Sequence, residues 1–289
     1  MPELGAVRKD VLQRLHAAGV DEHEAQREVI MILEHATGHR LAMQHLHADQ
    51  QLAPDSLEKI ERIVVQREKR VPLQYCLGEA WFMGLRFAVE PGVLIPRADT
   101  EKLVEVALQV LGGLAAPVFA DIGCGSGAIA ISILKSLPES KVFAIDISPV
   151  ALRVTEQNAD AHRVTDRLKL VGGDWLTFTP DRPLSAVISN PPYIPRRQAL
   201  ELQPEVAVFE PEEALFGEDA DGLRFYRQLG EHAWQLLRPN GLMALEVGQG
   251  QAEAVVALLE SGPWKNVTSH ADLNGIPRVV TAFRADPSC

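Results

Sequence analysis

Residues 118–128 read VFADIGCGSGA, an apolar run that ends in three closely spaced glycines. The run Val118–Ile122 predicts a buried strand, and the segment Ala128–Leu137 predicts a helix directly after it. Glycines at such a turn let the backbone bend tightly and approach a ligand, with the N–H groups of the next helix facing it. The turn also satisfies the dinucleotide fingerprint GxGxxA, so by itself it does not say which nucleotide-like ligand is bound.

From Val93 onward the chain alternates strand-like and helix-like segments, which predicts an α/β fold with a mostly parallel seven-stranded sheet and helices on both faces. The predicted strands are Val118–Ile122, Val142–Ile145, Leu168–Val171, Ala186–Ser189, Leu242–Val247, Val267–Ser269 and Val279–Phe283. The predicted helices are Glu101–Leu111, Ala128–Leu137, Val150–Ala161, Leu223–Leu237 and Gln251–Glu260. Ser148 and Pro149 are a good N-cap and first residue for the third helix. The stretch from Ile194 to about Gly222 is expected to be irregular.

Two later strand ends carry side chains that suit an adenosyl ligand, and the second of them discriminates better between NAD and another adenosyl cofactor. Asp146 ends the second strand, where a carboxylate can accept from ribose hydroxyls. Asp174 and Trp175 follow the third strand; the carboxylate can accept from an adenine amino group, and the indole can pack on the base. Because the carboxyl ends of parallel strands meet at one edge, we expect these residues to converge with the glycine turn.

The fourth strand delivers Asn190-Pro191-Pro192-Tyr193 to the same edge. Two prolines fix φ and remove two backbone N–H groups, so the carbonyls of this turn have few local donors. Asn190 adds another acceptor, and Tyr193 offers a flat face for stacking. The tetrad indicates a site for a planar amide or amine nitrogen; a plain proline turn at a strand end is the structural alternative.

The N-terminal part of the chain has a different pattern. Apolar residues recur at helical spacing over residues 1–75, with breaks such as Gly38 and Pro54, which predicts a small helical bundle. Alternating apolar residues within residues 76–92 predict a hairpin that links the bundle to a main domain over residues 93–289. A length of 289 residues is typical of two domains.

Composition bears on the class of partner. A net charge of −11 disfavours an enzyme that relies on broad phosphate neutralisation, so no direct nucleic-acid partner is expected. The three cysteines form neither a CxxC pair nor a disulfide framework, which favours a reducing cytoplasm. No apolar stretch approaches the ~20 residues of a membrane span, and the histidines lack a metal-ligand pattern. A cytoplasmic monomer without membrane or metal is expected.

The convergence of the glycine turn, Asp146, Asp174 and the tetrad resembles the S-adenosylmethionine-dependent class I methyltransferases, and implies their Rossmann-like fold. The tetrad is similar to that of their amino- and amide-nitrogen branch. Further segments narrow the resemblance to the release-factor glutamine methyltransferases, the HemK/PrmC family, over essentially the whole chain. These segments are Pro72–Tyr75 with Gly78, Ile95–Arg97 with Asp99–Glu101, Phe209–Pro211, Asp221–Leu223, and Asp272–Leu273 with Gly275 and Arg278. Ala98 departs from the family pattern, which usually has proline there.

The resemblance implies S-adenosylmethionine as cofactor and peptide chain release factors as substrate, methylated on the side-chain amide nitrogen (N5) of the glutamine in their Gly-Gly-Gln loop. It also implies that the N-terminal bundle helps to dock the factor. The expected cofactor-binding residues are Gly123, Cys124, Gly125, Ser126, Gly127, Asp146, Asp174, Trp175 and Asn190. The expected catalytic and substrate-binding residues are Asn190, Pro191, Pro192 and Tyr193. We expect Asn190 Oδ1 and the Pro191 carbonyl to accept the two amide N–H bonds.

Other readings stay open at this point. The substrate is alternatively a ribosomal-protein glutamine or an exocyclic amine of a nucleic-acid base, and the chain is alternatively a binding module with a vestigial pocket or, more remotely, an NAD dehydrogenase. Arg97 and Glu101 either line the methionine end of the cofactor or belong to a helix start capped by Asp99. Arg196 and Arg197 either steer the substrate or solvate a loop.

Overall fold

The computed structural model describes residues 1–217 and 219–286 and divides the chain into two compact units. The first unit holds Met1–Glu79 together with Gln203–Phe209. The second unit holds Ala80–Leu202 and the chain from Glu210 onward. A short segment from the second half of the chain therefore belongs to the N-terminal unit, an arrangement that no sequence pattern indicated.

The first unit is a helical bundle. Its helices are α1 (Leu4–Ala17), α2 (Glu22–Thr37), α3 (Leu41–Leu46), α4 (Pro54–Arg67), α5 (Leu73–Leu77) and, from the later segment, α9 (Pro204–Phe209). Apolar side chains at helical spacing, such as Leu15, Ile32 and Ile63, are buried together between α1, α2 and α4. Gly38 ends α2 with a φ of 73°, and Pro54 begins α4, so both act as the breaks that the sequence predicts.

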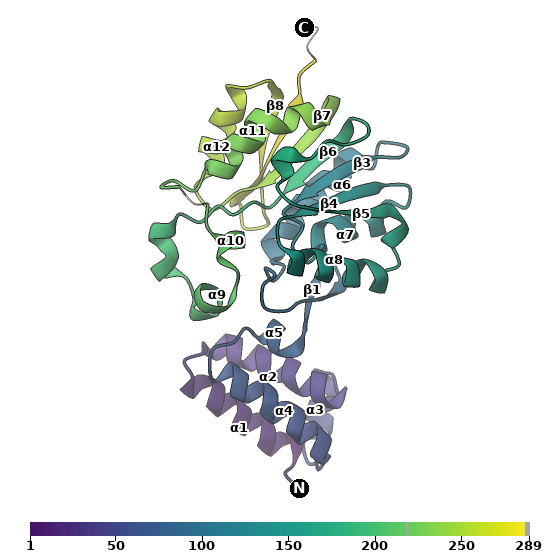
Figure 1. The fold of residues 1–289 in the computed structure, drawn as a ribbon. Coiled ribbons are helices and arrows are strands. Elements are labelled where there is room, and N and C mark those ends of the chain that lie inside the picture. The colour runs from purple at the N-terminus through teal and green to yellow at the C-terminus, as the bar shows by residue number, and fades with distance from the viewer. Residues whose placement is uncertain (218, 287–289) are drawn as a thin grey trace. The chain divides into compact units, whose positions relative to one another are not determined.

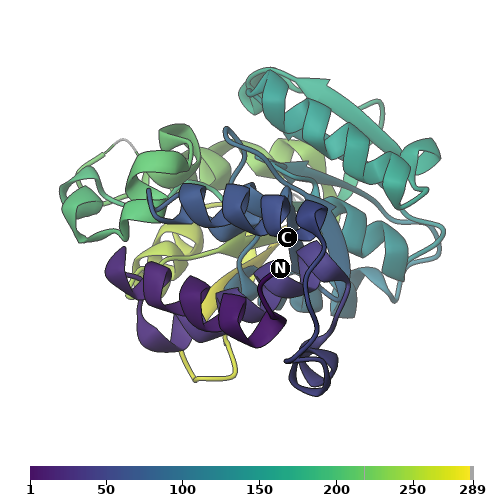
Figure 2. The same ribbon diagram turned by 90° about the horizontal axis from the view of Figure 1, so that it is seen from below.

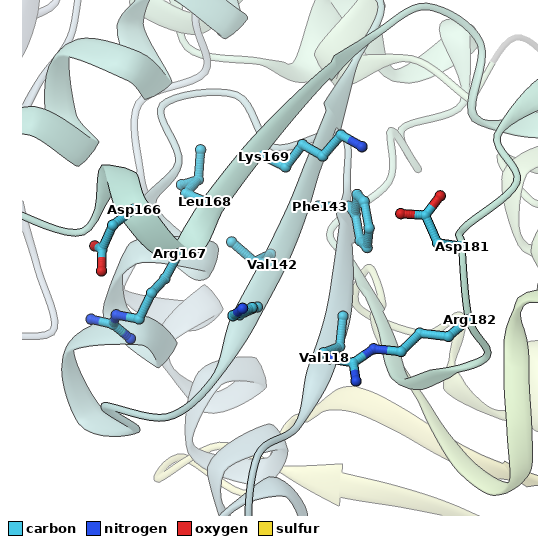
Figure 3. Close-up of a pocket in the computed structure, with 10 residues that line it drawn as sticks. Val118, Val142, Phe143, Asp166, Arg167, Leu168, Lys169, Asp181 and Arg182 are labelled. Atoms are coloured by element: carbon cyan, nitrogen blue, oxygen red, sulfur yellow. The ribbon is translucent and has the colours of Figure 1, made fainter.

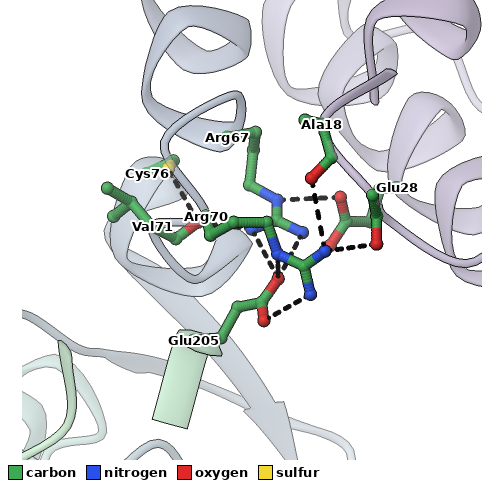
Figure 4. A network of polar contacts seen from close by, with 8 residues as sticks. Ala18, Glu28, Arg67, Arg70, Val71, Cys76 and Glu205 are labelled. Atoms are coloured by element: carbon green, nitrogen blue, oxygen red, sulfur yellow. Dashed lines mark hydrogen bonds and ion pairs between the residues drawn. The ribbon is translucent and has the colours of Figure 1, made fainter. Parts of the chain in front are cut away.

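A buried ionic network fixes α9 within this unit (Figure 4). Arg67 is fully buried and donates to Glu28 of α2 at 2.9 Å and to Glu205 of α9 at 3.2 Å. Arg70 donates to the other oxygen of Glu205 at 2.7 Å. Burial raises the pKa of Glu28, whereas at Glu205 the hydrogen bond from Arg70 and the charges of both arginines outweigh burial and lower the pKa. Two cations thus face two carboxylates, and the buried charges balance.

The second unit is built on a seven-stranded sheet in the order β5-β4-β3-β6-β7-β9-β8. Its strands are β3 (Val118–Ile122), β4 (Lys141–Asp146), β5 (Leu168–Gly172), β6 (Leu184–Ser189), β7 (Leu237–Glu246), β8 (Trp264–Ala271) and β9 (Pro277–Arg284). The first five strands pair in parallel, and β9 is antiparallel to β7 and β8. The strand order reverses between β3 and β6, which is where open α/β sheets bind ligands. A hairpin of β1 (Glu79–Phe82) and β2 (Leu85–Ala88) precedes the sheet.

Helices cover both faces of this sheet (Figure 1 and Figure 2). They are α6 (Glu101–Leu111), α7 (Ala128–Ser136), α8 (Pro149–Ala161), α11 (Arg224–Leu236) and α12 (Ala252–Glu260), with short turns η1 (Ala98–Thr100), η2 (Thr165–Arg167) and η3 (Trp175–Thr177). Phe119 packs with residues of α6 and α7, whereas its neighbours Val118 and Ala120 pack with α11 and α12. Because both faces are covered, the central strand β3 is buried along its whole length. The predicted fold class, including the N-terminal helical bundle, is confirmed.

The differences from prediction concern the bounds of elements. Strand β7 begins at Leu237 rather than Leu242, because its exposed residues 238–240 interrupt the apolar pattern. The stretch predicted to be irregular contains η4 (Arg196–Glu201), α9 and α10 (Glu212–Leu215). Each of these helices spans six residues or fewer, which is too short to produce a helical period in the sequence.

Candidate active site

The strand register brings the predicted segments to one edge of the sheet. Ile122 at the end of β3 pairs with Ile145 of β4 and with Ser189 at the end of β6. Asp146 pairs with Gly172 at the end of β5. The residues that follow these positions therefore lie side by side, with the glycine loop between Asp146 and the Asn-Pro-Pro-Tyr tetrad.

The glycine loop has the open backbone surface that a ligand needs. Gly125 has a φ of 56°, and a Cβ built on it would meet no atom within 4 Å. Gly127 has a φ of 78°, and a Cβ there would lie 2.9 Å from Thr155 Cγ2. Gly125 leaves one side of the loop open, whereas Gly127 allows the loop to pack closely against α8. Cys124 is buried in the loop, and burial raises the pKa of its thiol, which stays protonated.

Asp146 fixes the shape of this loop. Its two carboxylate oxygens accept from the backbone N–H groups of Gly125 and Ser148, each at 2.9 Å. Helix α8 holds the opposite side of the loop: Thr155 donates to the Gly125 carbonyl at 3.0 Å, and Asn158 donates to the Ser126 carbonyl at 2.9 Å. Burial raises the pKa of Asp146, and the two N–H bonds oppose that rise. A carboxylate has about four lone-pair directions, so Asp146 keeps capacity for further donors.

Asp121, near the carboxyl end of β3, is a buried carboxylate that the sequence analysis did not include in the site. Its Oδ2 accepts from the N–H of Ala130 in the first turn of α7 at 3.1 Å. Its Oδ1 has no hydrogen-bond partner among the described residues. Burial raises the pKa of Asp121 to about 7. Such an unpartnered buried acceptor suits a positively charged ligand.

The two side chains after β5 differ in exposure. Asp174 caps η3 by accepting from the Leu176 N–H at 3.0 Å, and its carboxylate lies at the strand edge. Trp175 is only 8% exposed and packs in the core beneath α11, so its burial has a structural reason of its own. Ile147, which directly follows Asp146, is 71% exposed. The sequence analysis did not include Ile147, whose exposure next to Asp146 makes it a candidate for contact with a ligand.

The tetrad is anchored on both sides. The side-chain amide of Asn190 donates to Thr100 Oγ1 at 3.2 Å. The hydroxyl of Tyr193 donates to Glu246 Oε1 at 3.5 Å, and its backbone carbonyl accepts from Gln251 Nε2 at 3.0 Å. Burial raises the pKa of Tyr193, so its hydroxyl remains protonated at neutral pH. With the nitrogen of its amide engaged by Thr100, Asn190 keeps its oxygen as a free acceptor.

A hollow of about 340 Å³ lies elsewhere on the second unit (Figure 3). Its lining includes Val118, Lys141 and Leu168, the first residues of β3, β4 and β5. It therefore opens at the amino ends of the parallel strands, opposite the edge that carries the glycine loop. Lys169 there lies over the ring of Phe143 at 5.4 Å from its centroid. This hollow is separate from the candidate active site.

Known proteins resemble this chain over nearly its whole length. The family model of the PrmC N-terminal domain matches residues 6–78, and that of the methyltransferase small domain matches residues 90–207. The release factor glutamine methyltransferase of Geobacter sulfurreducens is 39% identical over 281 residues, which cover 96% of this chain and 97% of that protein. The protein of the same name from Cereibacter sphaeroides is 39% identical over 272 residues, which cover 93% of this chain and 94% of that protein.

This chain belongs to the release factor glutamine methyltransferase family. The predicted enzyme class, an S-adenosylmethionine-dependent methyltransferase, is thereby confirmed together with its cofactor. Two solved structures share the fold alone. The hMettl16 catalytic domain has a TM-score of 0.58 at 14% identity, and the match covers 81% of this chain and 83% of that domain's chain. A methyltransferase from Pyrococcus furiosus has a TM-score of 0.52 at 16% identity, and the match covers 71% of this chain and 91% of that protein's chain.

Several charged residues of this methyltransferase are engaged in structural contacts. Arg97 pairs with the buried Glu210 at 2.5 Å, and Glu101 accepts from the Met83 N–H at 2.6 Å. Arg196 pairs with Glu212 at 3.0 Å and lies over the ring of Phe216, while Arg197 donates to the Ala220 carbonyl. The suggested capping role of Asp99 is wrong. Its carboxylate makes no cap and pairs instead with Arg278 at 2.7 Å.

Glu246 is a second buried carboxylate of the methyltransferase that the sequence analysis missed. It ends β7 beside the tetrad, because Leu245 pairs with Ser189. It is 2% exposed, and burial raises its pKa to about 7. The signal in the sequence is a lone acidic residue within the apolar run Leu242–Val247.

Residues 1–217 and 219–286 offer no candidate for a metal site or for a membrane span. There, no three or more histidine, cysteine or acidic side chains are grouped so as to hold a metal ion. No helix in these same ranges combines the length and the apolar character needed to cross a membrane.

Proposed function

We propose that the protein transfers the methyl group of S-adenosylmethionine to the side-chain amide nitrogen of the glutamine in the Gly-Gly-Gln loop of peptide chain release factors, and so tunes translation termination. The observation that carries this proposal is the pairing of Ile122 with Ser189, which holds the glycine loop and Asn190 at the ends of adjacent strands. A methyl donor over the loop and a nitrogen at the tetrad would then be neighbours. The names of the relatives supply glutamine as the group to be methylated.

The residues present fit S-adenosylmethionine. Its sulfonium and ammonium groups are positive, and Asp121 offers an unpartnered buried oxygen next to the glycine loop. Asp146 would accept from the ribose hydroxyls, and Asp174 from the adenine amino group. Ile147 would cover an apolar face of the base. When bound, the cofactor supplies a methyl group on a positively charged sulfur, which makes that carbon electrophilic.

The protein's task at the acceptor side is to orient a weak nucleophile. An amide nitrogen shares its lone pair with its carbonyl, so it attacks poorly without help. Asn190 Oδ1 and the Pro191 carbonyl would accept its two N–H bonds and hold the nitrogen in line with the methyl group. Positioning of this kind lowers barriers by ~7–11 kcal/mol in the best intramolecular cases. The same two acceptors stabilise the positive charge that develops on the nitrogen, by the logic of an oxyanion hole with its sign reversed.

The proton is lost after methyl transfer rather than before it. Methylation of the neutral amide creates an N–CH₃ bond, breaks the S–CH₃ bond and leaves the nitrogen positively charged. That charge makes the remaining N–H acidic, so water can accept the proton without a strong base. The tetrad accordingly contains no cysteine, histidine or lysine.

The N-terminal bundle is proposed to dock the release factor, as the match to the PrmC N-terminal domain supports. In this proposal Trp175 contributes by supporting the adenine site from below, and Pro192 and Tyr193 keep the tetrad rigid. The enzyme would act as a monomer in the cytoplasm, where translation factors work.

A labelling experiment tests the function. The protein is incubated with methyl-labelled S-adenosylmethionine and either a wild-type release factor or the same factor with Gln→Ala in its Gly-Gly-Gln loop. Label confined to the loop peptide of the wild-type factor is expected. Equal labelling of the two factors would reject the glutamine assignment, and label in ribosomal protein or RNA alone would favour another substrate.

A further inference from the structure

Gln251 stands at the start of α12, but its side chain does nothing for that helix. It is the N-cap residue, and its side chain makes no capping hydrogen bond. Serine, threonine, aspartate and asparagine are the residues that stabilise a helix from this position. The side chain of Gln251 instead contacts the last residue of the tetrad, Tyr193. Its presence at this position therefore has a reason outside the helix.

Three hydrogen bonds engage both N–H groups and the oxygen of the Gln251 amide. Its Nε2 donates to the Tyr193 carbonyl at 3.0 Å and to the Asp221 carbonyl at 3.2 Å. Its Oε1 accepts from the Gly248 N–H at 3.1 Å. All three partners are backbone groups, which cannot exchange the roles of donor and acceptor, so they fix the orientation of the amide.

Two glycines close around Tyr193 at the same place. Gly222 has a φ of 73°, and a Cβ built on it would clash with the Tyr193 carbonyl oxygen. A Cβ on Gly248 would lie 2.9 Å from the ring atom Cδ2 of Tyr193 and 2.7 Å from Gln251 Oε1. Neither position can carry a side chain unless Tyr193 or Gln251 moves. The end of the tetrad is thus enclosed closely by backbone and by one amide.

The same amide joins the two ends of a long segment of chain. Residues 194–220 lie between Tyr193 and Asp221 in the sequence, and Gln203–Phe209 within them belong to the N-terminal unit. Because one N–H of Gln251 holds Tyr193 and the other holds Asp221, the tetrad is fixed at the point where this segment begins.

We propose that Gln251 is a positioning residue that holds Tyr193, and with it the acceptors of the tetrad, in the geometry that methyl transfer requires. This inference rests on the proposed function, in which Asn190 Oδ1 and the Pro191 carbonyl orient the amide nitrogen. Prolines at 191 and 192 have a fixed φ, so a displacement of the Tyr193 backbone is passed to the Pro191 carbonyl rather than absorbed between them. A misplacement of about 1 Å can cost about 100-fold in rate.

Two substitutions that act on Tyr193 in different ways test the proposal. Gln251→Leu keeps the approximate size of the side chain and removes all three hydrogen bonds, whereas Gly248→Ala inserts a methyl group against both Gln251 and Tyr193. We expect each to lower kcat about tenfold or more, while the Kd for S-adenosylmethionine stays within about threefold. A kcat of Gln251→Leu within about twofold of the wild type would overturn the proposal.

The chain offers controls for both changes. Gly113→Ala adds a Cβ that meets only the Val110 carbonyl oxygen, at an ordinary 3.7 Å, and should leave kcat unchanged. The segment after the tetrad should stay closed in Gln251→Leu, because the Ile194 N–H donates to the Leu215 carbonyl at 2.9 Å without Gln251. A fall in kcat then reports the position of Tyr193 rather than an opened segment.

A spectroscopic measurement reports on Tyr193 without the substrate. The chain has three tyrosines, so labelling with fluorotyrosine gives a ¹⁹F resonance for each, and Tyr193→Phe identifies the one of interest. This resonance should shift or broaden in Gln251→Leu and in Gly248→Ala. Gln44→Leu removes a glutamine that likewise donates to two backbone carbonyls, at 2.9 and 2.8 Å, within the N-terminal unit, and should leave the Tyr193 resonance unchanged.

Two results of this measurement would overturn the proposal. One is an unchanged Tyr193 resonance in Gln251→Leu, and the other is an equal change in Gln44→Leu. Failure of the wild type to methylate the release factor would instead count against the proposed function, and the ¹⁹F resonances would still decide whether Gln251 holds Tyr193.

Discussion

The guanidinium of Arg67 donates to the carboxylate of Glu205 at 3.2 Å, although 138 residues separate them in the chain. Glu205 belongs to α9, which follows the Asn-Pro-Pro-Tyr tetrad along the sequence but packs within the N-terminal unit. The chain thus leaves the methyltransferase unit just after the tetrad, is held by buried charges, and returns at Glu210 (Figure 4).

Removing the charge of Glu205 should loosen this segment. In Glu205→Gln, the buried Arg67 keeps Glu28 but loses a charged acceptor, which we expect to cost about 1.5–3 kcal/mol of unfolding free energy. Glu61→Gln disrupts an exposed pair with Arg14 in the same unit and should cost about 0–1 kcal/mol. Urea unfolding measures both values, and amide exchange of residues 203–209 should rise only in Glu205→Gln. Equal effects of the two variants would contradict a structural role for the buried network.

Stability should fall as pH rises from about 4 to about 7 because of two buried carboxyls. Burial raises the pKa values of Asp121 and Glu246 to about 7 from 3.8 and 4.5, so within this window the folded state binds more protons than the unfolded state. Asp121→Asn and Glu246→Gln remove one titrating group each and should each flatten the decline. Urea midpoints measured at fixed ionic strength from pH 4.5 to 7.5 would show this. A decline just as steep in the double variant would exclude these carboxyls as its source.

Two glycines of the loop should respond differently to alanine. At Gly127, alanine is strained by the positive φ and its Cβ meets Thr155 at 2.9 Å, so we expect a loss of about 2–4 kcal/mol in stability. At Gly125 the Cβ meets no neighbour, and the φ alone should cost about 1–2 kcal/mol. Gly125→Ala should nonetheless weaken S-adenosylmethionine binding, because its methyl group occupies the open side of the loop. Thermal unfolding and calorimetry check the two effects, and a cofactor affinity unchanged in Gly125→Ala would remove this glycine from the site.

The sequence predicts the centre of the sheet well because its strands, such as Val118–Ile122, are buried on both faces and are mostly apolar. Where polar residues occur within a strand, as in residues 238–240 of β7, the apolar pattern does not show where the strand begins. The placement of α9 depends on the ion pair between Glu205 and Arg67. A pair of residues 138 positions apart produces no local pattern in a single sequence.

The sequence predicts those residues of the site that end or directly follow a strand. Gly125, Asp146 and Asn190 each follow an apolar run, and topology then brings them to one edge. Thr100 and Glu246 were missed because they are marked by contacts with the tetrad rather than by a motif of their own: Thr100 contacts Asn190, and Glu246 contacts Tyr193. Ile147 was missed because only its exposure in the folded chain marks it as more than part of a strand.

The central claim is that Asn190 serves chiefly to orient the substrate nitrogen and has only a small part in holding the cofactor. The most direct measurement compares Asn190→Ala with the wild type in single-turnover methylation of a release factor and in calorimetric binding of S-adenosylmethionine. We predict that the methyl-transfer rate falls about 100-fold or more, while the Kd for the cofactor stays within about threefold. A variant that methylates at a near-normal rate, or one whose loss of rate is matched by an equal loss of cofactor affinity, would contradict this account.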